Sequence, residues 1–253
     1  MAENSKIEWT DHTVNLWWGC AKEHTGCKNC YAEYFSDTRY KNDLWGEKKK
    51  RRRILSAFKD LNKYQRNAAS SGEKHRVFVG SMMDIFEDPK ELENPTDEFK
   101  TTGDLRDELF KRITDGQYDN LIFLFLTKRP RNIWKMIPDN WSHGWQNVWF
   151  GTSVSNEKTV IYADQLSASL SFQNLFLSIE PQIGPIHEMD LGNFDWVIQG
   201  GESGAKRRPF NIEWAYAMKH LCKEFGVPYF FKQIDKKTDI PEDLLVRELP
   251  EFY

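Results

Sequence analysis

The sequence predicts an α/β fold, a partial or irregular (β/α) barrel of about six to seven parallel strands. Short apolar, β-rich runs recur along the chain, and most of the gaps between them have room for a helix. The runs are continuously apolar rather than alternating, which indicates strands buried on both faces, as in parallel sheets. Strands that alternate with helices form βα units, for which a doubly wound sheet is the runner-up.

Each predicted strand ends abruptly in a polar or glycine-containing tail. The runs are Val14–Trp18, Val77–Val79, Leu121–Leu126, Val148–Phe150, Leu175–Leu177, Trp196–Ile198 and Tyr229–Phe231. Between them, Asp104–Thr114 and Asn211–Phe225 carry apolar residues at helical spacing, and a further helix is expected from Tyr31 onward. In either fold, ligands bind at the carboxyl ends of the strands, so the polar tails predict the site.

The bulk properties favour one domain. The length of 253 residues suits a single barrel, which we place at residues 1–233 with a basic insertion at 47–76, followed by a charged tail at 234–253. The basic run Lys48–Arg53 is typical of a solvated helix face, with nucleic-acid contact as the alternative. The net charge of −3 means that local basic patches would have to meet a nucleic acid. Without a long apolar run or an apolar signal core, we expect no membrane partner and a cytoplasmic location.

Three of the four cysteines form one motif, Cys20-x6-Cys27-x2-Cys30, after the first predicted strand. Clustered cysteines in a reducing compartment indicate a metal site rather than disulfides. Three thiolates can bind zinc or three irons of a 4Fe-4S cluster. Structural zinc needs a fourth protein ligand, for which His24 and Cys222 are the candidates. The cluster is the favoured interpretation, and it would leave one iron open to substrate or cofactor.

A series of motifs in order along residues 7–233 resembles one protein family. They are Ile7–Thr10, Gly19-Cys20, Gly26–Ala32, Gly80–Asp84, Leu126–Pro130, Phe176–Pro181, Gly200–Gly204, Arg208-Pro209 and Tyr229–Gln233. The chain is similar to a three-cysteine family of phages and bacteria that resembles radical S-adenosylmethionine (SAM) enzymes. The resemblance implies a 4Fe-4S cluster that binds SAM at its open iron, and an electron donor that reduces it. Cleavage of SAM would then yield a 5′-deoxyadenosyl radical that abstracts hydrogen. The first cysteine gap is longer here than in typical members.

The resemblance also implies a set of cofactor-binding residues. In such barrels the second strand ends in a motif that holds the SAM amino group, the fourth strand offers hydroxyls to the ribose or carboxylate, and the sixth lies near the adenine. The matching residues here are Ser81, Asp84, Ser153, Ser155, Ile198, Gly200 and Gly201.

Three charged residues at strand ends are candidate catalytic groups. Glu202 lies between glycines and could bind a ligand or cap a helix. Glu180 precedes a proline and could be a general base, a SAM ligand or a turn-former. Lys128 could hold a carboxylate or phosphate, or belong to a solvated loop. Lys232, at the end of the last strand, could be an ion-pair partner inside the barrel.

The function predicted from these features is a radical-SAM-like iron–sulfur enzyme that modifies or repairs a nucleic acid or nucleotide. The many aromatic residues and the basic segments suggest base stacking with phosphate contact. We expect Lys128, Arg129, Arg207 and Arg208 to form a basic surface beside the cluster. The alternative is a zinc-containing nucleic-acid-binding or accessory protein without radical chemistry, which needs a fourth zinc ligand and no SAM pocket.

Overall fold

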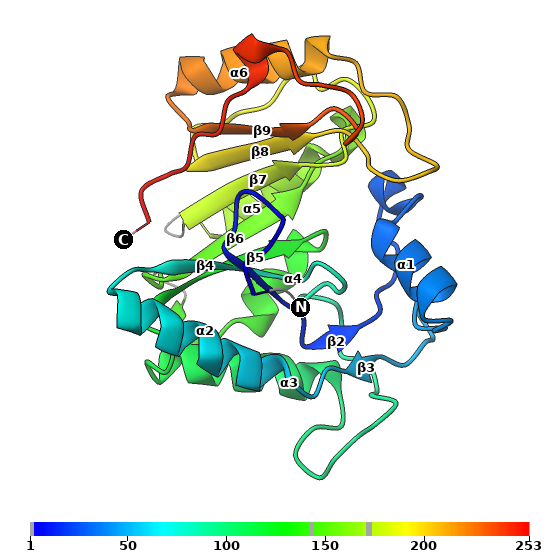
Figure 1. The fold of residues 1–253 in the computed structure, drawn as a ribbon, viewed down its shortest axis with the longest axis vertical. Coiled ribbons are helices and arrows are strands. Elements are labelled where there is room, and N and C mark those ends of the chain that lie inside the picture. Colours follow the sequence, from blue (N-terminus) through cyan, green and yellow to red (C-terminus); the bar gives the residue numbers. More distant parts are fainter. Residues whose placement is uncertain (1–2, 142–143, 171–173, 253) are drawn as a thin grey trace.

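A computed structural model of the chain describes residues 3–141, 144–170 and 174–252. One parallel sheet contains β1 (His12–Val14), β4 (His75–Val79), β5 (Leu121–Thr127), β6 (Val148–Ser153), β7 (Asn174–Ile179), β8 (Trp196–Gly200) and β9 (Tyr229–Gln233). The strands lie side by side in chain order, and the sheet curls into an open half-barrel (Figure 1). The predicted partial (β/α) barrel is therefore confirmed. A doubly wound sheet would reverse its strand order at a switch point, and this sheet does not.

The first predicted strand, Val14–Trp18, is wrong beyond its first residue, since only Val14 belongs to the barrel sheet. Parallel pairing ends with β1, and Trp17–Trp18 form β2, which pairs antiparallel with β3 (Arg52–Arg53) in a separate two-stranded sheet. The break falls at Asn15, because its side chain donates to Ser81 Oγ at 2.8 Å and accepts from the Met82 N–H at 2.7 Å. The cysteine loop is thus separated from the barrel sheet by this small ribbon.

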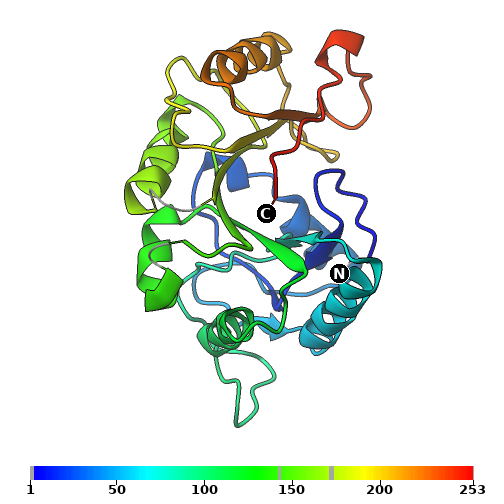
Figure 2. The same cartoon turned by 90° about the vertical axis from the view of Figure 1, so that its left-hand side faces the viewer.

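Helices cover the convex face of the half-barrel (Figures 1 and 2). The α-helices are α1 (Tyr31–Arg39), α2 (Ala57–Ser71), α3 (Thr102–Thr114), α4 (Pro130–Met136), α5 (Ile161–Ser169) and α6 (Glu213–Phe225). The 3₁₀ turns are η1 (Thr25–Cys27), η2 (Asp139–Trp141), η3 (Glu157–Thr159) and η4 (Glu242–Leu244). The helices α1, α3 and α6 match the three that the sequence predicts. In contrast to the others, α1 lies beside the carboxyl ends of the strands (Figure 1).

None of the helices that the structure describes is both long and apolar enough to span a membrane.

The two faces of the sheet hold separate apolar clusters, because successive side chains of a strand point to opposite faces. The larger cluster joins the sheet to the helices. The inner cluster consists of Trp9, Phe78, Ile122, Leu124, Trp149, Phe176, Trp196, Ile198 and Phe230. At Gly151 on the same face, a Cβ would lie 2.3 Å from the ring of Phe176, so only glycine lets that ring fill the barrel. The interior is therefore packed, and polar chemistry is confined to the carboxyl ends of the strands.

The predicted helix in the basic run Lys48–Arg53 is wrong, because these residues lead into β3 instead. Arg51 is fully buried, and its guanidinium donates to both carboxylate oxygens of Glu87 at 2.9 and 2.7 Å. Arg52 pairs with Glu93 at 2.8 Å. The loop after β4 thus supplies acidic partners for this run, which is held against the protein.

The C-terminal segment returns along the barrel after β9. The Phe231 N–H donates to the Val246 carbonyl at 3.0 Å. Further on, Phe252 packs on Trp149, with the ring centroids 4.9 Å apart, and so helps to cover the inner cluster.

Candidate active site

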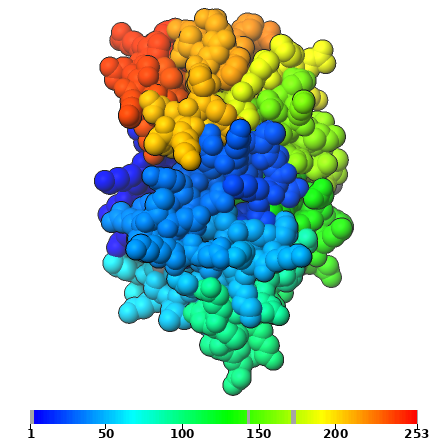
Figure 3. All heavy atoms as spheres, turned by 90° about the vertical axis from the view of Figure 1, so that its right-hand side faces the viewer, coloured from blue at the N-terminus to red at the C-terminus, as the bar shows by residue number. Residues whose placement is uncertain are grey.

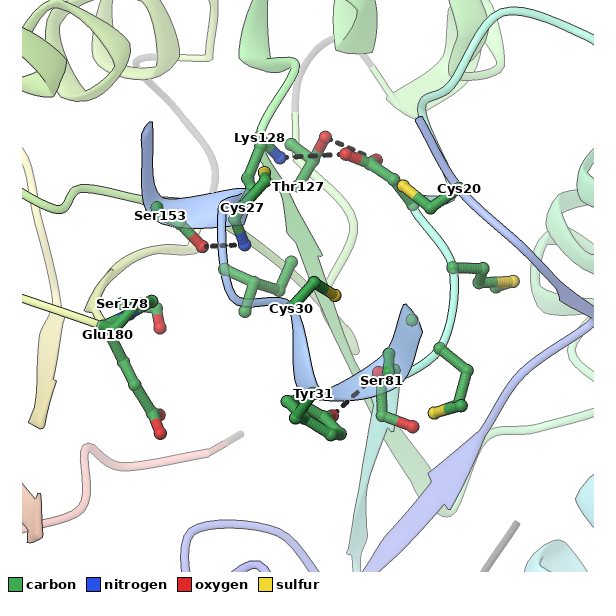
Figure 4. A pocket seen from close by; sticks show the side chains of 18 of the residues that line it. Cys20, Cys27, Cys30, Tyr31, Ser81, Thr127, Lys128, Ser153, Ser178 and Glu180 are labelled. Atoms are coloured by element: carbon green, nitrogen blue, oxygen red, sulfur yellow. Dashed lines mark hydrogen bonds between the residues drawn. The ribbon is translucent and has the colours of Figure 1, made fainter. Parts of the chain in front are cut away.

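A cavity of about 180 Å³ opens where the carboxyl ends of the strands meet the cysteine loop (Figure 4). The predicted site residues that line it are Cys20, Cys27, Cys30, Ser81, Asp84, Lys128, Ser153, Glu180, Gly201 and Glu202. They come from segments spread over most of the chain, and parallel strands explain how they meet at one edge.

Ser155, Ile198 and Gly200 do not line this cavity. Ile198 is fully buried in the inner cluster. Ser155 lies beneath the cysteine loop, where a Cβ on Gly26 would come within 2.4 Å of its Oγ. Binding of SAM by these three residues remains a prediction.

The conformation of the cysteine loop depends on two glycines. Gly19 has φ of +111°, and a Cβ there would lie 2.5 Å from the Leu44 carbonyl oxygen. Gly26 donates its N–H to Nδ1 of His24 at 2.9 Å, which fixes η1. Cys30 then precedes α1 at its N-cap position. The loop so formed turns its cysteines toward the space above the strand ends (Figure 4).

Neither candidate fourth zinc ligand reaches the cavity. The Nδ1 of His24 accepts the Gly26 N–H as the η1 cap, and its buried Nε2 has no hydrogen-bond partner among the described residues but does not line the cavity. Cys222 is buried on α6 in the helix-side core. Burial, together with nearby cations such as Lys128, lowers the pKa of His24 to about 3, so its ring is neutral. Among the described residues, no three thiol, carboxylate or imidazole groups converge closely enough to hold a single metal ion.

Cys20, Cys27 and Cys30 line one cavity, and thiolates can bind either one zinc ion or the irons of a cluster. Zinc with Zn–S bonds of about 2.3 Å holds its thiolates within roughly 4 Å of one another. Thiolates that each bind a different iron lie further apart. Burial raises the pKa of the Cys20 and Cys30 thiols, so both are protonated when no metal is bound and lose their protons on binding it.

Asp84 is saturated by contacts within the protein. One carboxylate oxygen accepts from Thr127 Oγ1 at 2.6 Å and from the Phe86 N–H at 3.1 Å. The other accepts from the Lys128 N–H at 3.0 Å and Arg129 Nη1 at 2.9 Å. Because a carboxylate offers about four acceptor positions, these bonds make Asp84 an anchor for the turn after β5. Its predicted contact with the SAM amino group remains untested.

Glu202 connects the loop after β8 to the cysteine loop. Its carboxylate accepts from Arg208 Nη2 at 2.6 Å, Arg208 Nε at 3.0 Å and Asn29 Nδ2 at 3.1 Å. Arg208 Nη1 also donates to the Thr25 carbonyl at 3.0 Å. Burial raises the pKa of Glu202, but these hydrogen bonds outweigh burial and leave the pKa below its usual value. Glu202 is therefore ionised and holds two segments together.

The cavity is also lined by two cations with different partners, Lys128 and Lys232. Lys128 Nζ donates to Ser153 Oγ at 3.1 Å, and no ion pair of Lys128 is found among the residues that the structure describes. Lys232 pairs with Glu180 at 2.6 Å, the interior ion pair that the sequence suggests for Lys232. Lys128 is thus available to bind an anion.

Sequence reasoning missed Ser178 and Asn29. Ser178 lies on β7, lines the cavity and pairs in register with Ser153. It precedes Glu180 by two residues. Period-two alternation along a strand could have identified it. The sequence shows only that Asn29 lies between two cysteines. Its role could not be predicted, because its partner Glu202 is distant in sequence.

The predicted basic surface is wrong. Arg129 is only 5% exposed and pairs with Asp84, and Arg208 pairs with Glu202. Arg207 pairs with Asp235 at 2.6 Å. Strand-end carboxylates therefore neutralise or bury the arginines that were expected to contact phosphate.

Exposed aromatic side chains lie on the helix that follows the cysteine loop. The helix α1 exposes Tyr31 and Tyr34, with 51% and 59% of their surfaces accessible. Tyr31 also lines the cavity and donates its hydroxyl to the Ser81 carbonyl at 2.8 Å (Figure 4). Figure 3 shows the N-terminal segments that include this helix, in blue, directly below the loop after β8, in orange. Tyr31 thus places an exposed aromatic ring at the cavity, and Tyr34 lies three residues further along the same helix.

Comparisons with known proteins agree with the fold. The profile of a family described as "Protein of unknown function (DUF5131)" matches residues 4–242. No curated protein matches the sequence. A cysteine-to-serine mutant of spore photoproduct lyase superposes with a TM-score of 0.52 at 13% identity, covering 90% of this chain and 78% of that one. A tyrosine-to-phenylalanine mutant of the same enzyme gives 0.52 at 14% identity, with the same coverage. The shared fold is a radical-SAM-like partial barrel.

Proposed function

We propose that this chain, which belongs to the DUF5131 family, is an iron–sulfur enzyme that cleaves SAM reductively and acts on a nucleic acid or nucleotide. The observation that carries the proposal is the shared cavity of Cys20, Cys27 and Cys30, whose lining includes neither His24 nor Cys222. Three protein ligands leave one iron of a 4Fe-4S cluster open to a cofactor. We place this activity in the barrel, residues 1–233.

Cys20, Cys27 and Cys30 would hold the cluster. When bound and reduced by an external electron donor, the cluster supplies the electron for cleavage of SAM. Glu202 and Asn29 keep the cysteine loop in place, because their hydrogen bond joins it to the loop after β8. Outer contacts of this kind orient metal ligands and tune their affinity.

The remaining groups of the cavity suit a zwitterionic cofactor with a planar base. Lys128 offers an ammonium group to a carboxylate, and Ser153 and Ser178 offer hydroxyls beside it. Aromatic rings of Trp9 and Trp45 also line the cavity and can pack against a planar base. The packed inner cluster closes the floor of the cavity, so bound cofactor is shielded from water on that side.

The nucleic-acid half of the proposal is supported by the exposed aromatic rings of α1. Exposed tyrosines beside a cavity can stack bases without reading their sequence, which is a common way of holding single strands. Tyr31 lines the cavity, and Tyr34 is exposed on the same helix. With Arg129 and Arg208 engaged inside the protein, stacking outweighs phosphate contact in this proposal.

Anaerobic reconstitution followed by a SAM-cleavage assay tests the proposed function. Reconstituted protein is expected to turn brown and, with a reductant, to release 5′-deoxyadenosine and methionine from SAM. A triple variant with Cys20→Ala, Cys27→Ala and Cys30→Ala should lose this activity. The matched control, Cys222→Ala, should keep it. Stoichiometric zinc without iron, or iron without any SAM cleavage, would contradict the proposal.

A further inference from the structure

We propose that Arg129 is a positioning residue that holds Cys20 and raises the reduction potential of the cluster bound there. The inference rests on the proposed function, since it concerns a group held by Cys20. It does not depend on the identity of the substrate.

Arg129 contacts both the backbone and the side chain of the cysteine loop. Its Nη2 donates to the carbonyl of Ala21 at 2.8 Å, and its Nη1 lies 4.0 Å from Cys20 Sγ. The same Nη1 donates to Asp84 Oδ2 at 2.9 Å. Each terminal guanidinium nitrogen carries two hydrogens, so one can point to the carboxylate and the other to the sulfur. Among the described residues, no guanidinium contacts the sulfur of Cys27 or Cys30 in this way.

Two of the carboxylates near Arg129 have cations of their own. Glu87 accepts from Arg51 through both oxygens, at 2.7 and 2.9 Å. Glu23 accepts from Arg131 at 2.9 Å. Arg129 approaches these two carboxylates only at 4.0 and 3.3 Å. Asp84 is thus the one carboxylate near Arg129 without a second cationic partner among the described residues, and Cys20 Sγ lies 4.0 Å from the same guanidinium nitrogen.

A buried cation next to a cluster ligand favours the reduced cluster. Reduction by a low-potential one-electron donor adds one negative charge and takes up no other group. A guanidinium nearby stabilises that charge more strongly in a buried site than in water. Hydrogen bonds to the ligand sulfurs act in the same direction, as is general for iron–sulfur proteins. Removal of the Arg129 charge should therefore make the cluster harder to reduce.

A potentiometric titration of the reconstituted protein, followed by electron paramagnetic resonance, measures this effect. Arg129→Gln should shift the one-electron reduction equilibrium about tenfold toward the oxidised cluster, a potential lower by roughly 59 mV. Arg129→Lys keeps the charge and should recover most of the shift. Arg66→Gln is the matched control, because Arg66 is an exposed arginine on α2 outside this network of ion pairs, and the potential of this variant should equal that of wild type.

Asp84→Asn gives an independent test that does not require Arg129 to be removed. It leaves the guanidinium less compensated, so the potential should rise. This variant decides the matter if Arg129→Gln does not fold. An iron-loaded Arg129→Gln with the wild-type potential, or Asp84→Asn with a lowered or unchanged potential, would overturn the inference. A wild-type protein that binds no iron at all would instead refute the proposed function.

Discussion

Asn29 donates a 3.1 Å hydrogen bond to Glu202, a residue 173 positions away in the sequence. Asn29 stands between Cys27 and Cys30, and Glu202 lies in the loop after β8. The bond therefore joins the segment that carries the candidate metal ligands to the far side of the half-barrel.

Asn29→Ala should weaken retention of iron. The side chain bonds both Glu202 and the Lys206 carbonyl, so its loss frees the loop between two cysteines. Loss of an outer contact to a metal ligand commonly costs roughly 10- to 100-fold in affinity. We expect iron to transfer to a chelator at least about tenfold faster than from wild type. Lys28→Ala, an exposed neighbour, is the control and should match wild type.

The iron content of cysteine variants should separate the metal site from the core. Wild type should carry about four irons and four sulfides per chain, as a 4Fe-4S cluster requires. The triple alanine variant at Cys20, Cys27 and Cys30 should carry none, whereas Cys222→Ala should keep the full content. Chemical analysis of iron and acid-labile sulfide gives these values. Retention of iron by the triple variant would exclude the assigned ligands.

Lys128→Met should weaken SAM binding. Lys128 is the cavity cation without an ion pair among the described residues, and hydrogen bonds to charged groups contribute roughly 1.5–3 kcal/mol. Loss of that contact corresponds to about a tenfold or larger increase in Kd. Equilibrium dialysis with labelled SAM measures this, with Lys135→Met on the exposed face of α4 as control. An unchanged Kd would assign Lys128 to another ligand.

Tyr34→Ala should weaken binding of single-stranded oligonucleotides. Stacking of a base on an aromatic side chain contributes about 1–3 kcal/mol, so a loss of roughly tenfold in affinity is expected. Fluorescence anisotropy at several salt concentrations provides the measurement. Phe225→Ala is the control, since Phe225 is 44% exposed at the end of α6, on the far side of the barrel. If wild type binds no DNA or RNA even at low salt, the substrate is a small molecule or a protein.

Asp11 should make folding stability depend on acid pH. Burial raises its pKa, but hydrogen bonds from the Arg76 side chain and backbone outweigh burial and leave it below 3.8. Because the folded pKa lies below the unfolded one, the stabilisation is fully present above about pH 3.8 and is lost as pH falls through the folded pKa.

Urea unfolding of Asp11→Asn tests this dependence. At neutral pH the variant should be less stable than wild type, and the difference should shrink as the pH falls below about 3.8. Asp97→Asn, on an exposed loop, should show no such convergence. A difference that stays constant down to pH 2 would show that the Arg76 contact does not govern it.

Local sequence patterns predicted most of the fold because each strand is buried by its neighbours in the chain. The six later strands lie where continuous apolar runs place them, and α3 and α6 follow their apolar spacing. The prediction of the first strand was wrong because the side chain of Asn15, inside the predicted run, bonds to Ser81 in the turn after β4. That contact spans 66 positions and leaves no local trace.

The candidate site was predictable in its location and not in its charge pairing. The strand-end rule placed Lys128, Glu180 and Glu202 around one cavity with the cysteines. The same rule does not say which arginine faces inward. Arg129 is buried because it pairs with Asp84 and Glu23, which come from other segments of the chain. These pairings could not be read from the local sequence.

The strictly sequential strand order bears on how the protein is made. During synthesis the chain emerges from its N-terminus, and each new βα unit can dock on the edge of the sheet already formed. The cysteines emerge early, but Glu202 follows β8 and arrives only when most of the barrel is complete. A nascent chain thus exposes three thiols before their loop is fastened. Delivery of iron and sulfide is therefore expected to succeed only after the eighth strand has left the ribosome, which makes cluster insertion a late, post-synthetic event.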